Sequence, residues 1–333
     1  MTNRFPFTPY PTGWFGVAFS HEVKPAEVKA LEYFGRELVL FRTASGTPVT
    51  ADAYCPHMGA HLGHGGSVSG ETIRCPFHYW VYSSSGACVE VPFCNSAPPS
   101  ARLNVWPTVE QNGLIYVWHD LAGRAPLWQM PVFDESLSVP DARQYMTVDI
   151  ETHPQEILEN VVDCAHFHAV HGVPSRVTVD RHAHVEPPIG EHIYYNVLIS
   201  RTGAGAPKVT KAWVVGPGCA RNVSGTDAIR FTHTLWPTPT NERNTRLRVI
   251  VDALVNPGSG IPPERVVQMV RENASMAALQ LRRDIAIWCR KAYVARPLLS
   301  AADGPLMRYR NWYSQFYPDR TAPAARAGAL DVS

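Results

Sequence analysis

A chain of 333 residues has room for two domains, and its content of 45% hydrophobic and 18% charged residues excludes a mainly disordered protein. Thirty basic residues against 29 acidic ones leave a formal charge of +1, so no surplus of positive charge points to a nucleic-acid partner. No run of about 18 apolar residues is present and the first residues lack a signal-peptide pattern, so we expect a cytoplasmic protein without a membrane span.

The first part of the chain predicts a small all-β domain over residues 1–125. A coil rich in proline and aromatic residues is expected first, up to about position 36. The β-prone segments that follow are 37–42, 48–54, 72–75, 80–83, 87–92 and 114–120. Gly46 marks the turn of the first hairpin. A proline-containing stretch at 122–140 then indicates the connection to a second domain.

The remainder predicts a domain of helices and longer strands over residues 126–318. A helix is expected at 154–172, and the strands expected after it are 192–202, 207–215, 228–236 and 245–254. Pro262 and Pro263 favour the start of a long helix that continues to about Lys291. Residues 319–333 are expected to form a flexible tail.

Two pairs of cysteine and histidine stand in the β-rich part. Seven cysteines, an odd number, argue against a disulfide scaffold, so clustered Cys and His are better read as metal ligands. Cys55 and His57 are separated by one residue, Cys75 and His78 by two, and 17 residues lie between the pairs. Zinc fingers keep cysteines together and histidines together, whereas each turn here carries one of each, which favours a two-iron cluster over structural zinc. The other histidines of this segment, expected as polar loop residues, are His61 and His64.

Three histidines occur within six residues of the helical segment at 154–172: His166, His168 and His171. Three imidazoles so close together are unusual for a core helix and indicate a metal site. His166 and His171 are five residues apart, which places them about 140° apart around a helix, so a helix that presents both must end or loosen there. Spacing alone leaves open which pair binds, and the i, i+4 arrangement of zinc proteases is absent.

A carboxylate ligand is expected from the long helix. Asp284 shares a helical stripe with Ala277, Leu281 and Trp288. A buried carboxylate on such a stripe requires a partner, which is either a metal or a basic side chain. Two imidazoles and one carboxylate are the usual protein ligands of non-haem iron, with positions left open for dioxygen. Glu272, earlier in the helix, is the competing candidate.

Two motifs resemble the signatures of Rieske non-haem iron oxygenases: C-P-H-x17-C-P-F-H at 55–78 and N-x2-D-x2-H-x4-H at 160–171. The resemblance implies a Rieske [2Fe–2S] cluster and a mononuclear Fe(II), with O2 as co-substrate. The implied cluster ligands are Cys55, His57, Cys75 and His78. The implied ligands of the mononuclear iron are His166, His171 and Asp284, with His168 as the spare histidine.

By the same resemblance, Asp163 connects two redox centres. In the family this residue lies at a subunit boundary, where it hydrogen-bonds a histidine ligand of the mononuclear iron and a cluster histidine of the neighbouring chain. The resemblance therefore implies a homotrimer in which each cluster serves its neighbour's iron. Asn160 is implied near the iron. The alternative for Asp163 is an ordinary carboxylate on a helix surface.

The implied fold is α+β, with an all-β Rieske domain followed by a helix-grip domain of the Bet v1/START kind. That second domain has an antiparallel sheet and a long C-terminal helix. No G-x-G-x-x-G fingerprint follows a strand, so electrons from NAD(P)H are expected to arrive through a separate reductase, with or without a ferredoxin.

The sequence D-I-A-I-W from Asp284 and the segment 303–317 look most like the branch of 3-ketosteroid 9α-hydroxylases and cholesterol 7-desaturases. The chain departs from that branch at Cys289 and Arg290, where members often have Glu-Asn. Tyr79 stands where many Rieske oxygenases have glycine. The C-P-F-H-aromatic-W turn also resembles the arylamine-oxidising branch.

The expected activity is therefore hydroxylation, desaturation or demethylation of a hydrophobic substrate, either steroid-like or an aromatic or polycyclic natural product. Three alternatives remain: an arylamine-type N-oxygenase, an electron-transfer Rieske protein without oxygenase chemistry, and a binder of hydrophobic ligands. The set of His166, His171 and Asp284 separates an oxygenase from the last two, because neither requires a second iron site.

Overall fold

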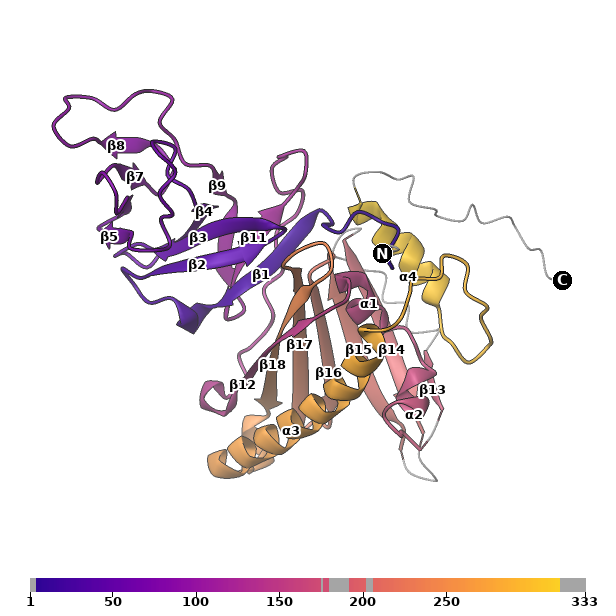
Figure 1. The fold of residues 1–333 in the computed structure, drawn as a ribbon. Coiled ribbons are helices and arrows are strands. Elements are labelled where there is room, and N and C mark those ends of the chain that lie inside the picture. The colour runs from indigo at the N-terminus through magenta and orange to yellow at the C-terminus, as the bar shows by residue number, and fades with distance from the viewer. Residues whose placement is uncertain (1–3, 175, 180–191, 202–205, 318–333) are drawn as a thin grey trace. The chain divides into compact units, whose positions relative to one another are not determined.

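The computed structural model describes residues 4–174, 176–179, 192–201 and 206–317 (Figure 1). The segment expected as a flexible tail, 319–333, lies outside the described residues. The chain divides into two compact units. One comprises residues 13–133 and 238–243, and the other comprises the described residues up to 12, from 134 to 237 and from 244 onward.

Antiparallel strands build the first unit, together with the short 3-10 helix η1 (Ser20–Glu22). One sheet has the order β1-β11-β10 (Gly13–Phe19, Leu114–His119, Thr108–Gln111). A second has the order β2-β3-β4-β9 (Val28–Tyr33, Arg36–Arg42, Pro48–Asp52, Val105–Trp106). A third has the order β5-β6-β7-β8 (Ser67–Ser69, Thr72–Arg74, Val81–Ser83, Cys88–Glu90).

Strands β1 and β2 lie in the segment that the sequence predicts to be coil, so that prediction is wrong. Every residue of β1 is buried, and its sequence GWFGVAF therefore lacks the alternation of polar and apolar residues that marks a half-exposed strand. Its partner β11 is buried along its whole length as well. Pairing between two such strands is decided by tertiary contacts rather than by a local pattern.

The core of the first unit lies directly beneath the Cys-His turns. Its buried side chains include Phe41, Leu62 and Ile73, and both Cys55 and Cys75 belong to the same cluster. The two cysteines are each 2% exposed. The turns are therefore anchored from below by their own cysteines, which leaves the histidines at the tips.

The second unit has a seven-stranded sheet with the order β12-β18-β17-β16-β15-β14-β13. In this same order, the strands span Gln144–Ile150, Thr245–Val255, Ile229–Pro239, Cys219–Gly225, Lys208–Val215, Ile193–Ser200 and Val177–Val179. The helices are α1 (Pro154–Glu159), α2 (His166–Ala169), α3 (Pro263–Trp288) and α4 (Leu306–Tyr313). The 3-10 helices are η2 (Pro140–Ala142), η3 (Pro257–Ser259) and η4 (Ser314–Phe316).

Helix α3 crosses one face of this sheet (Figure 1). Its buried residues Val266, Val270 and Ala274 recur at a spacing of four, which turns one stripe of a 26-residue helix toward the sheet. Pro263 occupies the first turn, where a missing N–H costs nothing. The stripe packs on Val249 and Val251 of β18. The α+β fold expected from the sequence is confirmed.

The helix expected at 154–172 is divided into two short pieces. Residues 160–165 interrupt it between α1 and α2, and Gly172, at φ +68°, follows the second piece. The end of α2 at Ala169 lies between His166 and His171 and agrees with the argument that the two cannot share one face of a continuous helix, whereas the break at 160–165 was not predicted. None of the helices in the described part of the chain combines the length and apolar character that crossing a bilayer requires.

Candidate functional site

The two Cys-His turns are built alike. In the first, the N–H of Gly59 donates to the carbonyl of Cys55, and the N–H of Cys55 donates to the carbonyl of Ala60. In the second, the N–H of Tyr79 donates to Cys75, and that of Cys75 donates to Trp80. Equivalent backbone hydrogen bonds thus place a buried cysteine and an outward histidine at corresponding positions of both turns.

Tyr79 occupies the position in its turn that Gly59 occupies in the other. Gly59 has φ +76° and Tyr79 has φ +62°, a left-handed conformation that favours glycine. This shared requirement explains why glycine is common at the position after the second histidine. The Arg74 guanidinium lies over the Tyr79 ring, 5.0 Å from its centroid, and a cation–π contact of this kind offsets part of the strain.

The donors of the two turns suit a two-iron cluster. The rings of His57 and His78 have centroids 4.7 Å apart, and the Trp80 ring stacks on His57 at 4.2 Å. Burial raises the pKa of the Cys75 thiol, and backbone N–H groups of Phe77 and His78 oppose that rise. Two buried sulfurs below two imidazoles, with N–H donors aimed at a sulfur, match the Cys2His2 arrangement of a Rieske centre.

A tyrosine hydroxyl lies beside one of these sulfurs. Tyr82 is fully buried, and its hydroxyl is 3.1 Å from Cys55 Sγ.

His61, outside the implied ligand set, has other contacts. It accepts from the N–H of Gly63 at 3.0 Å and lies 3.3 Å from Glu37. His61 therefore has the local partners of a polar loop residue.

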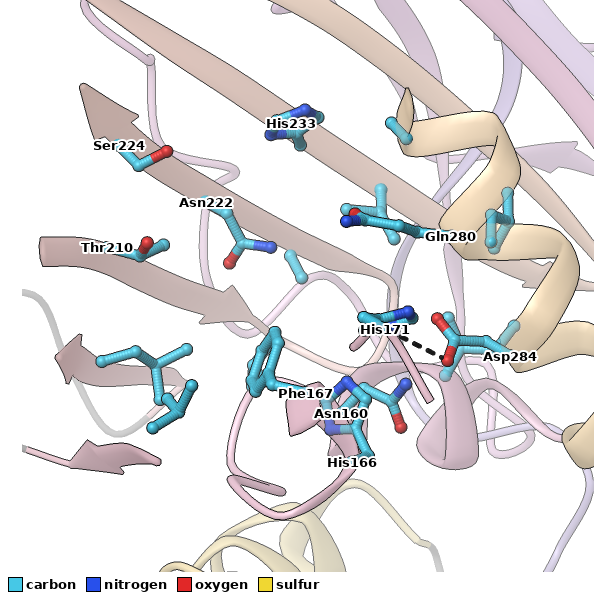
Figure 2. A pocket seen from close by; sticks show the side chains of 18 of the residues that line it. Asn160, His166, Phe167, His171, Thr210, Asn222, Ser224, His233, Gln280 and Asp284 are labelled. Atoms are coloured by element: carbon cyan, nitrogen blue, oxygen red, sulfur yellow. Dashed lines mark ion pairs between the residues drawn. The ribbon is translucent and has the colours of Figure 1, made fainter. Parts of the chain in front are cut away.

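The second constellation brings together His166, His171 and Asp284 (Figure 2). One potential ligand atom from each lies within 4.8 Å of the others. His171 Nε2 is 3.3 Å from Asp284 Oδ1, and the His166 and His171 rings have centroids 5.0 Å apart. All three side chains are largely buried. Two imidazoles and one carboxylate converging on a point fit the facial triad of non-haem iron.

Local contacts orient these side chains. His166 Nδ1 is 2.6 Å from the backbone carbonyl of Asp163, which makes Nδ1 the protonated nitrogen and leaves Nε2 for a metal. Burial lowers the pKa of His166, which keeps the imidazole neutral as ligation requires. Arg283 donates to the carbonyl of Val170 at 3.3 Å, a contact between α3 and the loop that carries His171.

The candidates weighed against this set lie elsewhere. His168 is exposed, and its Nδ1 is 2.8 Å from the carbonyl of Val173. Glu272 is exposed on α3 and accepts a hydrogen bond from Gln268. Neither residue is in the group of converging ligand atoms.

Asp163 is placed differently from the implied geometry. Its Oδ1 accepts from the N–H groups of Ala165 and His166, so the carboxylate starts helix α2. The carboxylate is 3.9 Å from His166 Nδ1, and the backbone carbonyl of Asp163 receives that ring N–H instead. The Asp163 side chain is 39% exposed, which leaves it accessible from outside. Asn160 ends α1 and lines the adjacent cavity.

A cavity of about 310 Å³ adjoins the three converging side chains. Its lining is mostly apolar, from Phe167, Leu235, Leu281 and Trp288 among others. The sheet contributes polar side chains that sequence reasoning missed: Ser200, Lys208, Thr210, Asn222, Ser224 and His233. Their strands were predicted only in part, so no signal marked which of them share a face.

Sequence reasoning also missed a buried charged network beside the site. Lys291 Nζ is 2.6 Å from Glu156, and Arg310 binds Glu159 with two contacts of 2.7 Å. Glu156 and Glu159 lie on α1, just before the histidine segment. The network ties α1 to the chain that follows α3, and the two carboxylates three residues apart in the segment PQEILE were the available signal.

Comparison with known proteins agrees with both centres. Residues 13–107 match the Rieske [2Fe-2S] domain, and residues 117–317 match the 3-ketosteroid 9alpha-hydroxylase C-terminal domain. The chain belongs to the Rieske non-haem iron oxygenases. Within that family it falls in the branch of 3-ketosteroid 9α-hydroxylases and cholesterol 7-desaturases, as the sequence resemblance indicated.

This oxygenase is 32% identical to cholesterol 7-desaturase nvd of Bombyx mori, over 96% of this chain and 72% of that protein. It is also 32% identical to a probable 3-ketosteroid-9-alpha-monooxygenase oxygenase component of Rhodococcus rhodochrous, over 93% of this chain and 80% of that protein. Among solved structures, dicamba monooxygenase with dicamba has a TM-score of 0.69 at 19% identity, covering 93% and 98% of the two chains. The NdmA QL mutant of Pseudomonas putida CBB5 with theobromine has a TM-score of 0.67 at 21% identity, covering 90% and 88%. These two structures share the fold.

Membership of the family establishes an oxidoreductase with a Rieske [2Fe–2S] cluster, and a mononuclear iron and O2 are consistent with it. As an oxygenase component, it requires a separate reductase. The expectations of an oxygenase class and of these cofactors are confirmed.

Proposed function

We propose that this oxygenase oxidises a hydrophobic steroid-like or polycyclic substrate held in the 310 Å³ cavity. The observation that carries the proposal is the convergence of His166, His171 and Asp284 on an apolar cavity large enough for a small organic molecule. Two relatives are named for their action on steroids, which supports a substrate with a steroid skeleton over other hydrophobic compounds.

In this proposal His166, His171 and Asp284 hold the mononuclear iron, which supplies dioxygen activation when bound. Asp284 contributes the negative charge of the ligand set. The Asp163 carbonyl holds His166 in the required tautomer through Nδ1. The apolar lining excludes water and turns a C–H bond of the substrate toward the three ligands. Cys55, His57, Cys75 and His78 hold the cluster.

We further propose a homotrimer, with Asp163 at the boundary between chains. The accessible carboxylate next to His166 supports this, because one oxygen caps α2 and the other remains available to a histidine of a neighbouring chain. Electrons originate from NAD(P)H and pass through a reductase, with or without a ferredoxin, which makes the cytoplasm the proposed compartment. The reaction is hydroxylation, desaturation or demethylation.

Oxygen uptake and product analysis test the proposal. The purified protein, with a surrogate reductase and NADH, should consume oxygen when steroids are added and yield oxidised carbon products. Metal analysis should give about three iron atoms per chain, against about two for an electron carrier or a ligand-binding protein with a Rieske centre. An arylamine N-oxygenase would instead form N–O products from arylamines and leave steroids unchanged.

A further inference from the structure

The cavity surface changes from apolar to polar along strands β16 and β17. Ala220 faces Leu235 across the two strands, and two residues further along β16, Asn222 faces His233. All four residues line the cavity. Side chains two residues apart on a strand share a face, so an apolar pair is followed directly by a hydrogen-bonding pair on the same surface.

The side-chain oxygen of Asn222 belongs to this surface. Its Oδ1 atom is buried, and no donor from the described part of the chain reaches it. Buried amide oxygens are normally paired, because an unpaired one loses its hydrogen bonds to water and gains none in return. An acceptor that faces a cavity and lacks a protein donor is suited to a donor on a ligand.

Asn196 shows what a structural asparagine looks like in the same row of side chains. The row runs from Asn196 through Ala212 and Asn222 to His233 across four neighbouring strands. Asn196 donates from its amide to the carbonyl of Val161 at 3.0 Å and is buried. Asn222 is also an asparagine on this face of the sheet, but its side-chain oxygen has no such partner among the described residues.

The surroundings favour an uncharged ligand group. Burial lowers the pKa of His233, an interaction with Asn273 opposes this, and the positive charge of Lys208 lowers it further. The His233 ring is therefore neutral at pH 7, with one donor nitrogen and one acceptor nitrogen. Lys208 also lines the cavity, but its side chain is exposed at the start of β15, where water screens its charge. A carboxylate or a ketone has only acceptor oxygens, whereas a hydroxyl can donate to Asn222 Oδ1 and also accept a hydrogen bond.

The polar pair and the metal ligands lie at different parts of the cavity wall. Figure 2 shows Thr210, Asn222 and Ser224 on the strands at one side of the view, and the His171–Asp284 ion pair at the other side, on the loop and α3. A ligand anchored at Asn222 thus reaches the metal ligands with its apolar body.

We propose that Asn222, with His233 opposite it, is a specificity-determining subsite for the hydroxyl group of an uncharged polycyclic alcohol. The contact positions the far end of that alcohol at His166, His171 and Asp284. This inference rests on the proposed function, because it names the substrate class of the same cavity. It distinguishes an alcohol from the corresponding ketone, which a hydrophobic cavity alone separates poorly.

Ligand binding to the intact oxygenase, without oxygen, tests the subsite. Three probes share one steroid skeleton: a 3β-alcohol, its 3-ketone and the 3-deoxy parent. Quenching of the protein's tryptophan fluorescence, to which Trp288 in the cavity wall contributes, reports the dissociation constants. The alcohol should bind about tenfold more tightly than the other two, the value of one net hydrogen bond. Asn222→Leu should bind all three alike, whereas the control Asn104→Leu, at an exposed asparagine of the first unit, should keep the preference.

Thermal unfolding of the ligand-free protein provides a second readout. Asn222→Leu should leave the midpoint unchanged or raise it, because an unpaired amide is removed, whereas Asn196→Leu should lower it by breaking the bond to Val161. A preference for the alcohol that persists in Asn222→Leu, or a marked loss of stability in that variant, would overturn the subsite.

The outcomes also separate the two proposals. If the three steroids bind and are oxidised without preference for the alcohol, or with preference for the ketone, the subsite is wrong and the proposed function stands. If none of them binds or is oxidised, the steroid substrate class is wrong, and the subsite inference that depends on it is overturned as well.

Discussion

The carboxylate of Asp284 lies 3.3 Å from Nε2 of His171, although one residue sits near the end of helix α3 and the other in the loop after α2. In the folded protein the two side chains are 12% and 6% exposed. A buried carboxylate requires a partner, and the convergence of Asp284 with His166 and His171 supports our proposal that this partner is a metal cation.

Asp284→Ala should remove about one iron atom per chain while the cluster remains. Helix α3 should persist, because its apolar stripe is unchanged and alanine favours a helix over aspartate by several tenths of a kcal/mol. Metal analysis measures the loss, and the EPR signal of the cluster measures what remains. The matched control is Glu272→Ala, an exposed carboxylate of the same helix. A variant with full iron content and normal turnover would make Asp284 a structural residue.

His171→Ala should leave the visible and EPR spectra of the cluster intact and abolish oxygenation, because the mononuclear site loses one of its three ligands. His168→Ala should be much milder, since His168 is exposed and its Nδ1 lies 2.8 Å from the carbonyl of Val173, outside the group of converging ligand atoms. Iron analysis and oxygen uptake on both variants check the assignment. Equal iron loss in the two variants would contradict it.

Asp163→Asn should separate electron transfer from metal binding. Asparagine also accepts hydrogen bonds from N–H groups at a helix start, so the contacts to Ala165 and His166 should survive and both metal sites should stay filled. With its oxygen occupied by these N–H groups, the amide of asparagine offers only an NH2 group, which cannot accept a hydrogen bond from a neighbouring chain's histidine as the second carboxylate oxygen could. Turnover should fall by orders of magnitude while the cluster is still reduced by a chemical donor.

Mixed oligomers extend this test to the route between chains. One chain carries Cys75→Ser and lacks the cluster, and the other carries His171→Ala and lacks the mononuclear iron. Some mixed trimers then combine an intact cluster with the intact iron of a neighbour, and partial activity should return. No recovery in verified mixed trimers, or normal turnover by Asp163→Asn, would refute the route.

Tyr82→Phe should lower the reduction potential of the cluster. The Tyr82 hydroxyl lies 3.1 Å from Cys55 Sγ, and a hydrogen bond to a thiolate ligand stabilises the more negative, reduced state. A difference of about 1 kcal/mol between the two redox states corresponds to roughly 40 mV for one electron. An EPR-monitored redox titration measures it. Tyr54→Phe is the control, because that exposed hydroxyl donates to Glu37. An equal shift of the reduction potential in both variants would show that Tyr82 does not tune the cluster.

His153→Asn should weaken the loss of stability in acid. Burial lowers the pKa of His153 to about 3, against about 6.5 when unfolded. Between these values the unfolded chain binds the extra proton, so stability falls as the pH drops below about 6.5. At pH 5.5 the cost is about 1.4 kcal/mol relative to high pH. Asparagine still accepts from the N–H of Gln155 at the start of α1.

Denaturant unfolding of wild type and His153→Asn at pH 7.5 and pH 5.5 provides the comparison. Relative to wild type, the variant should have a higher unfolding free energy at pH 5.5 than at pH 7.5. Parallel changes in both proteins would mean that other groups, and not His153, cause the acid sensitivity.

The amino-acid sequence by itself determined the chemistry of the two centres. Cys55 with His57, and Cys75 with His78, are close along the chain, and tight turns bring such pairs together whatever the rest of the fold does. His166 and His171 are equally local, and their spacing predicted that the helix ends between them, as α2 does at Ala169. Local spacing translates directly into local geometry, because few backbone conformations connect neighbouring residues.

Only the tertiary structure decided which distant residues complete these centres. Asp284 was already the preferred candidate from its helical stripe, with Glu272 as competitor, and the fold places Asp284 beside His171 while it leaves Glu272 exposed. Strand β16 was not predicted, because CARNVSG has little β propensity, and it forms through pairing with β15 and β17. That pairing sets Asn222 opposite His233. The register between strands depends on contacts along the whole sheet, which no single segment encodes.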